Sequence, residues 1–192
     1  MEDMNFEELR NQFAILKDQL KKQEIVSDHL IRETMKAKTS NINSTKRMCY
    51  VCTAIALLAT PMNYLSHAWS LPFCIVTCLM MLFCAVATYV IHKPVDNLNF
   101  ITDDFATVAR VMAQFKRKYD IWLYYVSPVI GIPWLGWAFY DSAFRHAAEG
   151  MNPWFMVIAL IIGGSIGFAI GLYYHFKAVN AAKDIIKQIE EQ

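Results

Sequence analysis

The chain alternates between long apolar stretches and polar segments, and four of the apolar stretches contain no Asp, Glu, Lys or Arg. Each is about 20 residues long, and an α-helix of that length crosses the roughly 30 Å hydrocarbon core of a bilayer. The pattern therefore predicts an all-α integral membrane protein with four transmembrane helices, arranged as two hairpins. The expected spans are residues 48–66, 71–91, 121–140 and 153–176.

A polar segment, residues 1–45, precedes the membrane domain 46–192, and residues 5–38 of it have the pattern of a helix. Its apolar residues recur at alternating spacings of three and four, the seam of a heptad repeat: Phe6, Leu9, Phe13, Leu16 and Leu20. The seam becomes polar after two heptads, and so short a coiled coil is marginal alone. Two interpretations stay open: an oligomerising coiled coil, or an amphipathic helix lying against the protein or the membrane. Residues 39–45 lack strong helix formers, so we expect a hinge there.

A second amphipathic helix is expected over residues 103–120, between the two hairpins. Thr102 is the expected N-cap, and the two aspartates that follow it suit the positive end of the helix dipole. Its apolar stripe again has the three-four spacing: Phe105, Val108, Met112, Phe115 and Tyr119. We therefore expect both amphipathic helices to offer surfaces for self-association or for a cytoplasmic regulator.

Prolines modify three of the four spans. Pro61 should kink the first span or end it early, and Pro128 and Pro133 predict a bent or broken third span. Pro72 opens the second span, where its missing N–H costs little. The tail, residues 177–192, is expected to continue the fourth span as one straight helix.

Charge distribution predicts the orientation in the membrane. Lys and Arg number nine in residues 1–47, five in 92–120 and three in 177–192, but only one in 142–152. Because positively charged loops stay in the cytoplasm, both termini and the central segment are expected on the cytoplasmic side of the membrane. The net charge of +1 gives no electrostatic reason to expect direct binding to nucleic acid.

The sequence lacks Ser-His-Asp, H-E-x-x-H, Walker and paired-carboxylate patterns. Cys49 and Cys52 form a C-x-x-C, but a structural zinc site needs more ligands than this pair supplies, so we interpret both as packing residues. His67 and His146, on the expected outer side with Glu149, lack further ligands for the same purpose. We predict a non-enzymatic protein without catalytic, cofactor-binding or metal residues.

Gly163, Gly167 and Gly171 lie on one face of the fourth span as G-x-x-x-G-x-x-x-G. Helices in lipid gain little from the hydrophobic effect, and small-residue faces let their backbones approach closely. These glycines therefore predict a helix-packing surface, for a helix of the same chain or of a neighbouring copy. The alternative function is a small oligomeric channel or transporter with a pore lined by this face and Ser165.

Two regions carry a family resemblance. The segment LKKQEIVSDHLIRETMKAKTSNINS, residues 20–44, and more loosely the region from YVIHKPVDNLNF to FKRKYDIWL, resemble uncharacterised small multi-pass inner-membrane proteins of Bacteroidota. The genes of that group often lie near those of extracytoplasmic-function sigma factors. The resemblance implies a cytoplasmic segment that binds a regulatory protein such as a sigma factor, and it carries over no catalytic residues.

Overall fold

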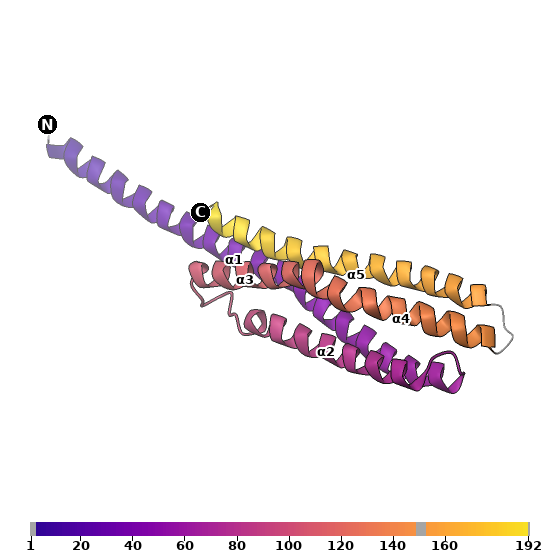
Figure 1. Ribbon diagram of the computed structural model, residues 1–192. Coiled ribbons are helices and arrows are strands. Elements are labelled where there is room, and N and C mark those ends of the chain that lie inside the picture. Colours follow the sequence, from indigo (N-terminus) through magenta and orange to yellow (C-terminus); the bar gives the residue numbers. More distant parts are fainter. Residues whose placement is uncertain (1–2, 149–152, 192) are drawn as a thin grey trace. The chain divides into compact units, whose positions relative to one another are not determined.

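In the computed structural model the chain is all-α, as expected, and residues 3–148 and 153–191 are described. The elements follow one another as α1 (Asp3–Leu65), α2 (Leu71–Asp96), α3 (Phe105–Ile121), the π-helical turn η1 (Trp122–Val126), α4 (Ser127–Ala148) and α5 (Pro153–Glu190) (Figure 1). The chain divides into two compact units. We call them the N-terminal unit, residues 1–37, and the bundle unit, residues 38–192, and describe each by itself.

Three helices of the described residues, α1, α2 and α5, are long and apolar enough to cross a membrane. The chain is therefore a candidate multi-pass membrane protein. The remaining expected span, residues 121–140, is shared between the end of α3, η1 and α4 and does not form a helix of its own. Its tryptophans, tyrosines and prolines also make it less hydropathic than the other three stretches.

The hinge expected over residues 39–45 is wrong, because α1 is helical throughout this segment. Ile42 is fully buried, and Thr39 and Thr45 are nearly so. The hydroxyl oxygen of Thr45 lies 3.1 Å from the carbonyl oxygen of Asn41 and 3.2 Å from that of Tyr174 in α5, so these two carbonyls share its single proton. Packing against the other helices of the bundle unit thus outweighs the poor intrinsic helix propensity of this segment.

The stretch expected as the third span, residues 121–140, is widened rather than broken. The backbone N–H of Ser127 bonds to the carbonyl of Trp122, five residues back, which makes η1 a π-helical turn between α3 and α4. Pro128 lies just beyond this turn; it lacks an N–H, and its ring would clash with a carbonyl of a regular α-helix. A wider turn relieves that clash, so α3, η1 and α4 continue as one rod that also passes through Pro133.

Several expected element boundaries also change. The N-cap of α3 is Asp104 and not Thr102, which begins no helix. α1 continues past Pro61 to Leu65, and α2, with Pro72 in its first turn, continues beyond residue 91 to Asp96. The expectation that α5 runs unbroken into the tail is confirmed.

The best-packed region of the bundle unit lies at the end where α2 finishes and α3 begins, which we call the basal end. Its fully or almost fully buried side chains form the basal core: Ile42, Val95, Val108, Met112, Phe115, Ala182 and Ile185. By contrast, only 11, 11 and 0% of the residues in the apolar windows of α1, α2 and α5 are buried. The apolar stripe of α3 therefore packs inside its own chain, and the expectation that residues 103–120 offer it to a partner is wrong.

The opposite, apical end is held by an aromatic cluster and a charged hydrogen bond. Phe73 of α2 is fully buried, with ring contacts to Trp69, Trp134 and Trp137 at centroid distances of 5.1–5.8 Å. The Asp141 carboxylate, which is 6% exposed, accepts a hydrogen bond from the backbone N–H of Ser70 at the start of α2. A carboxylate at a helix N-terminus is favoured by the helix dipole.

Residues 141–148 are helical and form the last part of α4.

We predict that the basal core, and not the lipid-facing surface, determines the stability of the bundle unit. Ile185→Ala removes a fully buried side chain, and we expect a loss of about 3 kcal/mol in the free energy of unfolding. The matched control is Ile132→Ala, whose side chain is 68% exposed and should cost little. Unfolding by SDS titration, followed by circular dichroism, measures both; equal losses would contradict the prediction.

Candidate functional site

A cavity of about 420 Å³ lies between the helices of the bundle unit, next to the basal core. Its volume is within the range typical of small-molecule sites. No Asp, Glu, Lys or Arg is among the residues that line it, so its walls are apolar and aromatic with a few neutral polar groups. They are Thr45, Met48, Cys49 and Cys52 of α1, Thr88 and Ile91 of α2, Tyr119 of α3, Trp122 of η1, and Gly167, Ile170, Gly171, Tyr174 and His175 of α5.

Two of the three predicted packing glycines, Gly167 and Gly171, form part of this wall, and Gly163 does not. A Cβ atom built at any of the three would meet no atom within 4 Å in the described part of the chain. No helix of the described chain therefore packs closely against this face. Packing against a neighbouring copy stays a prediction, as does a pore lined by this face and the exposed Ser165.

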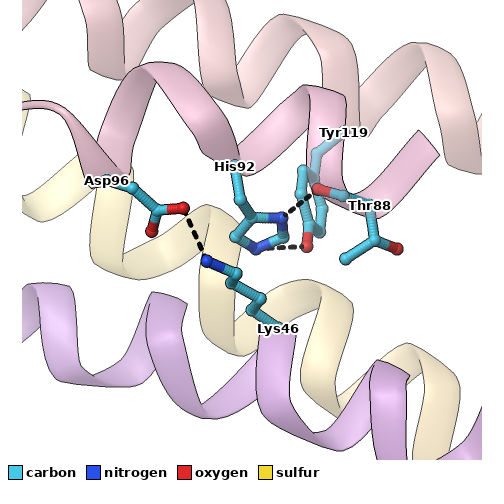
Figure 2. A network of polar contacts seen from close by, with 5 residues as sticks. All are labelled: Lys46, Thr88, His92, Asp96 and Tyr119. Carbon is cyan, nitrogen blue, oxygen red and sulfur yellow. Dashed lines mark hydrogen bonds and ion pairs between the residues drawn. The ribbon is translucent and has the colours of Figure 1, made fainter. Parts of the chain in front are cut away.

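A polar network borders the cavity where α2 and α3 meet (Figure 2). The ring of His92 is fully buried; its Nδ1 lies 2.8 Å from the carbonyl oxygen of Thr88, and its Nε2 lies 3.1 Å from the hydroxyl oxygen of Tyr119. A carbonyl only accepts, so Nδ1 carries the proton in neutral His92 and Nε2 accepts from Tyr119. Burial, with a smaller contribution from Cys49, raises the pKa of Tyr119, which keeps its hydroxyl protonated as the donor.

An ion pair between Lys46 of α1 and Asp96 of α2 lies beside His92 in Figure 2. Together with the Tyr119–His92 bond, it links α1, α2 and α3 at the side of the cavity next to the basal core. Each of these polar groups has a partner among the described residues, and the contacts hold α1, α2 and α3 together.

His175 closes the cavity from α5. Its ring is 8% exposed and lies against the ring of Tyr119, with 5.5 Å between the ring centroids. The network thus continues from His92 through Tyr119 to a second imidazole at the cavity wall.

The C-x-x-C pair lines the same cavity, and both cysteines are free thiols. The sulfur of Cys49 lies 3.0 Å from the hydroxyl of Thr88. Within the described residues, no group of three or more His, Cys, Asp or Glu side chains is placed to hold a metal ion. The side chain of His146 and all of Glu149 lie outside the described residues, so a site with His67 is not tested.

The predicted partner-binding seam lies on α1 within the N-terminal unit. Phe13, Leu16 and Leu20 are 67, 54 and 59% exposed. Phe6 and Leu9 belong to the same helix, but their side chains lie outside the described ones.

No protein-family model, no curated protein and no solved structure matches this chain. The resemblance to Bacteroidota membrane proteins therefore stays a prediction.

The cavity could not be predicted from the sequence. Its wall includes the C-x-x-C, Tyr119 at the end of the α3 stripe and His175 of α5, which lie far apart along the chain. The packing of the helices brings these residues together, and the spacing of residues within a single segment does not predict that packing. The polarity of His175 at the end of an apolar span was the one available signal.

We predict that the Tyr119 hydroxyl stabilises the bundle unit through His92. Tyr119→Phe leaves the buried Nε2 of His92 without its donor and should lower the free energy of unfolding by about 2 kcal/mol. Tyr124→Phe is the matched control, since that side chain is 66% exposed and removal of its hydroxyl should change little. Thermal unfolding of the two variants distinguishes them, and an unchanged Tyr119→Phe would refute the role of this bond.

Proposed function

We propose that this chain is a non-enzymatic, four-span inner-membrane scaffold that acts through helix–helix contacts, and that the heptad seam of its N-terminal unit binds a second copy of the chain. The observation that carries the proposal is the exposure of large apolar side chains at seam spacing. Phe13, Leu16 and Leu20 lie on one face of α1, and such a face is stabilised when it is buried against another helix.

Four spans are supported by the contacts at the two ends of α2. Ser70, before α2, bonds to Asp141 in α4, and His92, near the end of α2, bonds to Tyr119 in α3. From position 70 to 92 and from 119 to 141 there are 22 residue steps in each case. At about 1.5 Å per residue, both stretches cover about 33 Å, which is close to the thickness of a hydrocarbon core. The stretch 119–141 thus extends as far as the candidate span beside it.

A second copy is the partner that the pattern favours. A heptad seam pairs most readily with another heptad seam, and this chain offers an identical one in each copy. Two heptads are marginal in solution, but anchoring in a common membrane raises the effective concentration of the two helices. A cytoplasmic regulatory protein, such as the sigma factor that the family resemblance implies, is the competing occupant.

The topology has a direct test. With four spans and the observed distribution of Lys and Arg, both termini should be cytoplasmic. We expect a C-terminal fluorescent-protein fusion to fluoresce and a C-terminal alkaline phosphatase fusion to be inactive. Phosphatase fused after His67 should be active and serves as the control. A chain with three spans would place its C-terminus outside and give an active phosphatase fusion at the end of the chain.

Self-association through the seam is tested by Leu16→Glu. A charge within a buried seam is costly, so cross-linking of full-length copies in native membranes should fall about tenfold or more. Ile15→Glu is the matched control, because Ile15 is 56% exposed but lies off the seam, and it should cross-link like the wild type. Loss of a different cross-linked protein, with no effect on copy-to-copy products, would assign the seam to a regulator instead.

A further inference from the structure

We propose that the cavity binds an uncharged, lipid-soluble molecule whose flat ring bears a carbonyl oxygen, the chemistry of a quinone. The proposal does not depend on the seam of the N-terminal unit.

His175 is 8% exposed and lines the cavity, yet no hydrogen bond joins its ring nitrogens to the described part of the chain. The one fully enclosed side-chain polar atom without a partner among the described residues is Oε1 of Gln188. The nitrogens of His175 therefore border open space. An imidazole N–H that faces an apolar cavity without an acceptor is unfavourable there, and a ligand carbonyl at the cavity wall supplies that acceptor.

The side chains that line the cavity are uncharged, and several are aromatic. Tyr119, Trp122 and Tyr174 add aromatic surface to that of His175, and no charged side chain faces the cavity. Rings pack favourably on rings in offset or edge-to-face arrangements, which favours a flat ligand over a branched aliphatic one. An ionised ligand would be left without a counter-charge there, so the occupant is neutral.

Two glycines of α5 form one side of the cavity. Gly167 and Gly171 present bare backbone to the cavity, and a Cβ at either position would meet no atom of the described chain. Larger side chains at these two positions would extend into the space that a ring needs. Trp122, at the start of η1, lies in a π-helical turn, an irregularity that recurs at functional sites.

The test uses the full-length chain in phospholipid nanodiscs with menadione, a short naphthoquinone, as the probe. We expect saturable quenching of tryptophan fluorescence above the linear background of a probe that merely partitions into lipid. The saturable part should vanish in Trp122→Phe and persist in Trp69→Phe, because Trp69 lies at the apical end. Saturable quenching that survives Trp122→Phe would overturn the proposed location.

Two further variants test the contacts. Gly167→Leu should weaken binding at least about tenfold by filling the cavity, whereas Gly163→Leu, on the same face outside it, should not. His175→Phe should weaken binding about tenfold at unchanged thermal stability, since one hydrogen bond to the ligand is lost. Wild-type affinity in both cavity variants, or equally strong competition by dioleoylglycerol, would overturn the proposal.

Discussion

Burial of the α3 stripe in the basal core is the interaction on which the rest of the structure depends. Apolar helices surrounded by lipid gain little from the hydrophobic effect, because lipid tails are as apolar as the side chains. The effect acts fully only where helices leave the hydrocarbon and meet water. Val108, Met112 and Phe115 of α3 are buried against α2 and α5, and the exposed apolar parts of the candidate spans extend from this anchor.

The cavity lies where that packing ends. Below it, the basal core is closed and the groups of the His92 network are paired; above it, most side chains of the spans face outward. At the far end, the helices are brought together again by Phe73 and by the bond from Ser70 to Asp141. A bundle held firmly at both ends and loosely between them leaves room for a small molecule without loss of its helical framework.

The sequence predicted the all-α class, the apolar helices α1, α2 and α5, and the unbroken tail, because length and hydropathy are local properties. Predictions from the sequence were wrong where contacts between distant segments determine the local structure or the burial of a residue. Residues 39–45 look like a hinge in isolation but are helical, because Ile42 is buried by other helices. The stripe of α3 has the same spacing as the seam of the N-terminal unit, and spacing alone does not tell an internal stripe from one available to a partner. The cavity and the role of Asp141 depend on contacts between distant segments, which no local pattern records.

The π-helical turn η1 also has a consequence for the rod to which it belongs. A π-turn holds one residue more than the α-helical turn that it replaces, and one residue corresponds to about 100° of rotation around an α-helix. The heptad spacing of the α3 stripe therefore does not extend into α4. Residues of α4 at the same heptad positions lie on a different side of the rod. The extra residue rotates the side-chain positions of α4 by about 100° relative to those of α3. The rod can therefore present differently placed faces to its neighbours before and after η1 without an intervening loop.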